Sequence, residues 1–207
     1  MPSRFIFFYL LSSILLLSTL PSLSAQTALQ FAKQGKEYAL QGNYDAAIQA
    51  YEASLRANRH QGHTHYYLGI CYFETEQYEL AIRSFTRAIA IYAGDPLYFD
   101  FRGRCLARLE KYSEALDDYD TAVEMAPLNN QFRYHRGLSW AALGDHKEAI
   151  KDFDFAISQE HRVGDYYRSR GMCKIALGDR TGACMDLQQA LELHAFNAKY
   201  LLKKHCQ

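Results

Sequence analysis

Three histidines, His60, His63 and His65, crowd the stretch RHQGHTHYY, and neutral imidazoles of this kind bind Zn²⁺ or Cu²⁺. A catalytic metal site also needs a fixed geometry and a group that carries a proton, which so short a cluster does not specify by itself. The stretch lies at a junction between two helical patterns, where His65 occupies the position that Phe31 and Phe99 hold elsewhere. A solvated linker with one histidine on a packing face is therefore the prediction, and a metal site is the alternative.

Other catalytic constellations are missing from the sequence. It contains no Walker loop, no dinucleotide-binding glycine pattern, and neither GxSxG nor HExxH. Lysine and arginine together number 23, as do aspartate and glutamate, so the formal net charge is zero. Without a basic stripe or a long run of one charge, neither nucleic acid nor a lipid-headgroup surface is expected as a partner. The sequence thus predicts a protein that is not an enzyme and needs no cofactor.

The first 25 residues have the layout of a secretory signal peptide. One basic residue precedes an apolar run from Phe5 to Leu20, and Pro21 and small residues follow up to Ala25. We expect residues 1–25 to be removed and residues 26–207 to form the mature domain, which is exported to the periplasm or secreted. An uncleaved anchor is the alternative, and the serines and small residues that follow the apolar run disfavour it.

A stricter spacing governs the remainder of the chain, because glycines recur every 34 residues without a gap. Alanines follow these glycines at a fixed distance of twelve residues, and an aromatic residue or leucine stands four residues further on. Self-similarity at a period of this length indicates a repeat architecture. The glycines are Gly35, Gly69, Gly103, Gly137 and Gly171, and the alanines are Ala47, Ala81, Ala115, Ala149 and Ala183.

Each repeat divides into two amphipathic helical patterns joined by short breaks such as QGNY and LEKY. Breaks this short allow only a tight turn, so the two helices must be antiparallel neighbours. A glycine in mid-helix costs about 1 kcal/mol relative to alanine, and its recurrence predicts a close crossing of helices. We expect each glycine to oppose the alanine that follows it, with the aromatic residues filling the grooves beside them.

A 34-residue helix–turn–helix with glycine, alanine and aromatic residues at these offsets resembles the tetratricopeptide repeat (TPR). The resemblance spans residues 28–197 and implies an all-α solenoid of five TPR units followed by a capping helix. The family's proline near the end of each unit appears only as Pro127, and the fifth unit departs most from the pattern. The predicted units are 28–61, 62–95, 96–129, 130–163 and 164–197, with the cap helix at 198–207.

Five cysteines follow the leader, so at least one is free or bonded to another chain. Cys71, Cys105 and Cys173 each stand two residues after a repeat glycine. Equivalent sites on stacked helices lie about 10 Å apart, which is too far for a disulfide. The closing segment also resembles that of many exported bacterial repeat proteins, which implies a Cys184–Cys206 bond that staples the cap to the fifth hairpin. Two packed thiols are the alternative.

Charged residues recur in the last three units only. An arginine stands directly before the glycine, and an aspartate stands fifteen residues after that glycine. In an antiparallel hairpin these positions lie within about half a turn of opposite, which predicts an ion pair between the helices. Contact to the next unit's arginine, with Lys204 serving the last aspartate, is one alternative, and two solvated faces are another. The pairs are Arg102 with Asp118, Arg136 with Asp152, and Arg170 with Asp186.

The TPR resemblance implies that partners bind along one face of the first helix of each unit, which lines a concave groove. This face combines an aromatic and aliphatic centre with a charged spot, and apolar patches of this kind mark binding sites. Packing of these side chains against neighbouring first helices is the alternative. The predicted groove residues are Tyr66, Ile70, Phe73, Asp100, Arg104, Arg108, Tyr134, Leu138 and Arg168.

We therefore expect an interaction scaffold that binds a protein or peptide in its groove, within an envelope assembly or maturation complex. A self-associating structural protein is one alternative, because the first unit has no preceding cap. A metal-binding protein centred on the three histidines is the other.

Overall fold

The computed structural model describes residues 23–206, and every regular element within this range is an α-helix. Residues 1–22 of the predicted leader lie outside the described part. In chain order the helices are α2 (Leu23–Leu40), α3 (Tyr44–Ala57), α4 (Gly62–Glu74), α5 (Tyr78–Ile91), α6 (Pro96–Arg108), α7 (Tyr112–Met125), α8 (Asn130–Leu143), α9 (His146–Gln159), α10 (Gly164–Ala176), α11 (Arg180–Glu192) and α12 (Ala198–Cys206).

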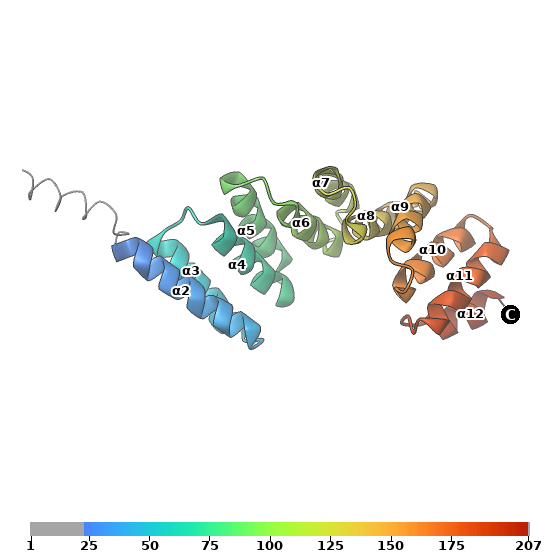
Figure 1. Cartoon of the computed structure of the whole chain (residues 1–207), viewed down its shortest axis with the longest axis horizontal. Helices are drawn as coiled ribbons and strands as arrows, with labels where there is room; N and C mark the ends of the chain where they lie inside the picture. The colour runs from blue at the N-terminus through green and yellow to red at the C-terminus, as the bar shows by residue number, and fades with distance from the viewer. Residues whose placement is uncertain (1–22, 207) are drawn as a thin grey trace, which may run out of the picture.

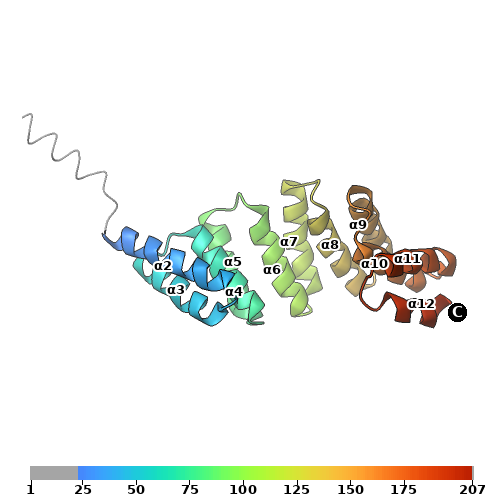
Figure 2. The ribbon, with the colours of Figure 1, turned by 60° about the horizontal axis from the view of Figure 1, so that its bottom comes forward.

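The helices form a row of hairpins along one long axis, from α2 and α3 at one end to α11 and α12 at the other (Figures 1 and 2). The first helices of units two to five begin at the first residues of the predicted units, Gly62, Pro96, Asn130 and Gly164. Together with the all-helical content, this arrangement confirms the predicted α-solenoid.

The first unit differs from the prediction, because α2 begins at Leu23 rather than at Ala28. Ala28 is buried, and its carbonyl accepts a hydrogen bond of 2.7 Å from the hydroxyl of Ser54 on α3. The helix is therefore anchored on its neighbour close to its start. It also runs through the point before Gln26 at which cleavage of the leader is expected.

The turn inside each hairpin has one residue in the left-handed backbone region, and this residue recurs every 34 positions. Glycine adopts this conformation without steric cost, whereas a residue with a Cβ pays about 1–2 kcal/mol. Glutamate nevertheless holds the position in the second and third hairpins. The turn residues are Gly42 (φ 74°), Glu76 (φ 59°), Glu110 (φ 60°), Gly144 (φ 90°) and Gly178 (φ 83°).

Four of the five repeat glycines face aromatic rings, which corrects the expected contact between glycine and alanine at these four. Gly171 instead lies beside Asp186, the carbonyl oxygen of Ala183 and Leu187. A Cβ placed on Gly69 would lie 2.7 Å from Cε1 of Phe85, well inside van der Waals contact. Gly35, Gly103 and Gly137 stand in the same relation to the aromatic residue sixteen positions later. The alanines are instead buried on the second helix one turn away from that ring, with no exposed surface at Ala47, Ala81, Ala115, Ala149 or Ala183.

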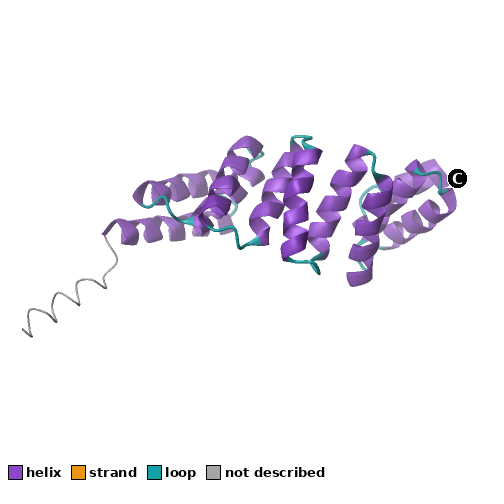
Figure 3. Ribbon diagram, turned by 90° about the horizontal axis from the view of Figure 1, so that it is seen from above, coloured by secondary structure: helices purple, strands orange, loops and turns teal. Residues whose placement is uncertain are grey.

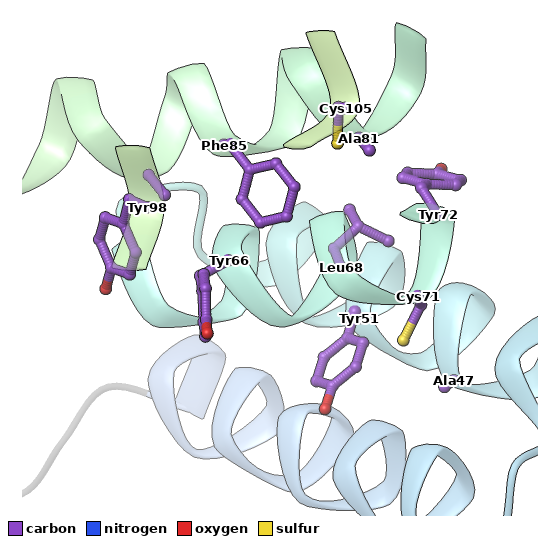
Figure 4. Close-up of a cluster of buried hydrophobic side chains, with 11 residues drawn as sticks. Ala47, Tyr51, Tyr66, Leu68, Cys71, Tyr72, Ala81, Phe85, Tyr98 and Cys105 are labelled. Carbon is purple, nitrogen blue, oxygen red and sulfur yellow. The ribbon is translucent and has the colours of Figure 1, made fainter. Parts of the chain in front are cut away.

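The largest group of buried side chains lies between α3 and α6 (Figure 4). The side chain of Tyr51 points from α3 toward α2, and the ring of Phe85 on α5 lies beside that of Tyr66 on α4. Tyr98 of the next unit stacks against Tyr66, with ring centroids 4.9 Å apart. Aromatic side chains therefore carry the contact from one unit to the next.

The first helices of successive units, α2, α4, α6, α8 and α10, contact one another, and across residues 23–206 the second helices form the more widely spaced layer. Because closer spacing lies on the inside of a bend, the first helices form the inner surface of the stack. Figure 3 shows the row of helices and the short loops between them from above. Among the described helices, none is both long and apolar enough to cross a membrane.

Candidate functional groove

The predicted groove residues divide between the core and the inner surface. Tyr66 is only 9% exposed and lies among the rings of Phe85, Tyr98 and Phe101, and burial raises the pKa of its hydroxyl. Asp100 is also buried, and its carboxylate is 2.7 Å from Nδ1 of His135. These two side chains therefore pack between units and do not line the groove.

The remaining predicted residues are accessible to different degrees. Ile70, Phe73 and Tyr134 are half-buried, and the ring of Tyr134 lies 4.8 Å from that of Tyr166. Leu138 is exposed on α8, and Arg168 is half-buried on α10. The structure thus places the accessible part of the predicted face on α4, α6, α8 and α10.

A groove of about 620 Å³ runs between α8, α10 and α12. It brings together Leu138 and Arg168, which the sequence predicts, with Met172, Phe196 and Tyr200. Four of these five side chains are apolar or aromatic, and Tyr200 has 59% of its surface exposed. Binding grooves in proteins combine an apolar lining with a few polar groups in the same way.

The polar groups of this groove lie at its rim. Arg168 is held by Asp165 at 3.1 Å, and its guanidinium donates to the carbonyl of Phe196 at 3.4 Å. The ring of His146 contributes a buried Nδ1 that has no hydrogen-bond partner within the described chain. The groove can therefore hold an apolar side chain while presenting hydrogen-bonding groups beside it.

A smaller recess of about 230 Å³ lies between α6 and α8. Phe73, Arg104 and Arg108 line it, and Leu138 belongs to both the recess and the larger groove. Arg104 lies over the rings of Phe73 and Phe101, at 4.7 and 4.4 Å from their centroids. The two hollows therefore adjoin at Leu138, and each has at least one arginine in its lining.

Sequence reasoning missed the contribution of the cap to this surface. Phe196 and Tyr200 come from the segment that was assigned only to covering the last unit. Tyr200 stands 34 residues after Tyr166 and 68 after Phe132, so the repeat period itself continues into the cap. Extending the period by three residues past the fifth unit would have placed Tyr200 on the same side as the first helices.

A disulfide between Cys184 of α11 and Cys206 of α12 holds the cap in place, with the two Cα atoms 5.7 Å apart. Cys71, Cys105 and Cys173 are free thiols and are buried. Cys173 borders the groove, but burial raises the pKa of its thiol to about 11, so the thiol is protonated at neutral pH. It is a packing group there and not a nucleophile.

The three histidines of the linker are not brought together. Nδ1 of His63 pairs with the hydroxyl of Tyr98 at 2.8 Å, and Nε2 of His65 lies 3.2 Å from the carbonyl of Arg59. Among residues 23–206, no group of three or more histidine, cysteine or acidic side chains is placed to hold a metal ion. The alternative of a metal site at His60, His63 and His65 therefore has no geometric support.

A sequence model of the tetratricopeptide repeat family matches residues 33–96 and 102–159, which together make up more than half of the chain. The chain is a TPR protein. No curated protein sequence matches it.

Solved TPR structures share this fold at low sequence identity. A crystal structure of MamA is 24% identical, with a TM-score of 0.76, and the match covers 84% of this chain and 96% of MamA. MamA from Desulfovibrio magneticus RS-1 is 17% identical, with a TM-score of 0.77 and coverage of 81% and 95%. YrrB, a TPR protein with an unusual peptide-binding site, is 22% identical, with a TM-score of 0.71 and coverage of 80% and 86%.

In the half of this TPR protein that bears the groove, ion pairs between arginine and aspartate join neighbouring helices, and we call these ion pairs charge clamps. Arg136 donates from Nε and Nη2 to both oxygens of Asp152 on the second helix of its own unit, at 2.8 and 2.7 Å. Its Nη1 donates to Asp120 on the preceding unit at 2.8 Å. These hydrogen bonds raise the pKa of Arg136 further above its already high value. The predicted pair within the hairpin is confirmed, and one arginine ties three helices together.

Arg170 repeats this arrangement with Asp186 and Asp154. Arg102 pairs with Asp118 in the same way. In the preceding unit, however, its Nη1 donates to the hydroxyl of Thr86 and not to an aspartate. The alternative that Lys204 serves Asp186 is wrong, because Lys174 occupies that place, with its Nζ 2.8 Å from Oδ2. Lys204 lies over the ring of Tyr200 instead.

Proposed function

We propose that this TPR protein is a non-enzymatic scaffold that binds an extended segment of a partner protein along its inner surface. The observation that carries the proposal is the apolar groove between α8, α10 and α12, which adjoins the recess between α6 and α8. The same fold in YrrB, a TPR protein with an unusual peptide-binding site, supports it. The signal-like leader further supports a role in an envelope assembly or maturation complex.

Matched leucine variants test the groove. Leu138→Glu places a charge in the wall shared by both hollows, and Leu128→Glu makes the same change in the exposed turn between α7 and α8. A photo-crosslinking residue placed at Met172 in the full chain should capture a partner in the native envelope. Capture should fail with Leu138→Glu and persist with Leu128→Glu. Equal capture by the two variants would show that the groove is not the binding surface.

Self-association is a second candidate, and the outer face of α2 favours it. Leu29 and Leu40 stand three helical turns apart on one side of this helix, and both are largely exposed. Light scattering over a concentration series tests it, with Leu29→Lys/Leu40→Lys as the variant. A mass that stays monomeric at all concentrations would exclude self-association.

A further inference from the structure

The recess between α6 and α8 holds an arginine whose charge is not compensated. The structure records no carboxylate within ion-pair distance of Arg104 among residues 23–206, whereas Arg102, Arg136 and Arg170 each contact at least one aspartate. Phe73 and Phe101 lie against the guanidinium and fix its position. Stacking of this kind uses the faces of the guanidinium and leaves its N–H groups, which lie in the plane, free to donate.

A buried hydroxyl in the same recess also lacks a partner. Ser139 is 1% exposed, lines the recess, and its Oγ makes no hydrogen bond within the described chain. An unsatisfied buried hydroxyl costs free energy, which a ligand atom that accepts its proton would recover. Ser139 and Arg104 come from different helices, so the orphaned hydroxyl is an observation independent of the unpaired charge.

The other charged groups around the recess do not cancel the positive charge of Arg104. Arg108 lies 3.8 Å from Glu76 in a pair that is exposed on both sides, so this pair compensates little of its charge. His135 lines the recess, and its Nδ1 faces the buried carboxylate of Asp100, which does not line it. The lining therefore offers hydrogen-bond donors without an exposed carboxylate of its own.

The position of the recess indicates which carboxylate would fill it. Leu138 continues the surface toward α10 and α12, and Phe73 continues it toward α4. An extended chain that lies along the inner surface must therefore pass the recess with an internal residue. On the basis of the proposed function, we propose that this recess binds the side-chain carboxylate of an acidic residue in the bound peptide, held by Arg104 and Ser139.

Peptide pools of defined chemistry test this site. Each pool has a rhodamine label at its start, an amidated end, random neutral residues and one fixed central residue, which is Glu, Gln or Lys. A fourth pool has a central Gln and a free C-terminal carboxylate. Fluorescence polarisation measures binding to the full mature chain and to Arg104→Gln, with Arg83→Gln on the outer helix α5 as the matched control.

The Glu pool should bind about tenfold more tightly than the Gln pool, which is the size of effect expected for hydrogen bonds to a charged group. The advantage should vanish in Arg104→Gln and remain in Arg83→Gln. Ser139→Ala, which removes only a hydroxyl, should reduce it by a smaller factor. Circular dichroism spectra that match the wild type show that each variant is folded.

Equal binding of the Glu, Gln and Lys pools would overturn the carboxylate site. If that binding were lost in Leu138→Glu, the groove function would stand without it. Tighter binding of the free C-terminal pool than of the Glu pool would assign the recess to a chain end and would also overturn the proposal. Failure of every pool to bind would refute both the groove function and the acidic site that depends on it.

Discussion

The contact between repeat glycines and aromatic rings can be tested at Gly69. Gly69→Ala adds one carbon, whose position would lie 2.7, 2.8 and 2.9 Å from three atoms of the Phe85 ring. Phe85 has no exposed surface, and it packs against Tyr66 and Phe101. Because the ring is buried and contacts two further rings, a shift of the ring would disturb their packing, and the substitution overpacks the second hairpin.

The magnitude follows from two opposing effects and a matched control. Overpacking a core costs about 1–3 kcal/mol, while alanine gains about 1 kcal/mol of helix propensity over glycine. Gly171→Ala gains the same propensity, but its new carbon would meet Cβ of Asp186, the carbonyl oxygen of Ala183 and Cγ of Leu187 at 3.2–3.3 Å, which is a milder overlap than at Gly69. We expect Gly69→Ala to be about 1–2 kcal/mol less stable than Gly171→Ala, or about 2–8 °C lower in melting temperature.

Urea unfolding followed by far-UV circular dichroism measures both variants, and Phe85→Leu supplies the rescue. In the Phe85→Leu background, Gly69→Ala should cost less than in the wild type, because leucine lacks the ring atoms that the new carbon would meet. The reasoning is refuted if Gly69→Ala and Gly171→Ala stabilise the protein equally. That result would mean that helix propensity alone decides the effect.

Three further predictions concern the clamps, the turns and the cap. Arg102→Met should destabilise the chain by about 3–5 kcal/mol because it leaves the buried carboxylate of Asp118 unpaired, and adding Asp118→Leu should recover most of the loss in urea titrations. Glu110→Gly should raise stability by about 1 kcal/mol because the turn residue has φ 60°, and an unchanged or lower urea midpoint would contradict this. Cys206→Ser should cost about 3 kcal/mol, as expected when a disulfide that spans 22 residues is removed. Hydrogen exchange should locate that loss in α11 and α12, and uniform exchange along the chain would count against it.

The 34-residue spacing was sufficient to predict the solenoid, because each hairpin repeats the same packing. The joint presence of Arg102 with Asp118, and of its counterparts, was sufficient to predict the ion pairs. The nearest neighbour of four of the five glycines was misjudged, because the sequence places alanine and ring on neighbouring turns of one helix and does not show which of them lies under the glycine. Only the tilt between the two helices decides this.

The groove was predicted in part. Tyr66 was placed on the accessible face because the helical period carries it there, but the ring turns under Tyr98 and Phe101 of the next unit. That contact depends on the twist between units, which a period along the sequence does not encode. The role of the cap was missed for a related reason. The chain turns at His194 and Asn197, two residues with positive φ that are not glycine, and the sequence does not show in which direction this turn sends the cap.

The arrangement of the charge clamps also determines whether further hairpins can be added to the chain. Each arginine of the last two units takes one aspartate from its own hairpin and one from the hairpin before it. Duplicating residues 130–163 in tandem would give the inserted arginine both of its aspartates and leave Arg170 with two as well. Gene duplication can therefore extend the scaffold in this half without leaving a clamp arginine unmatched, and each added hairpin would lengthen the inner surface.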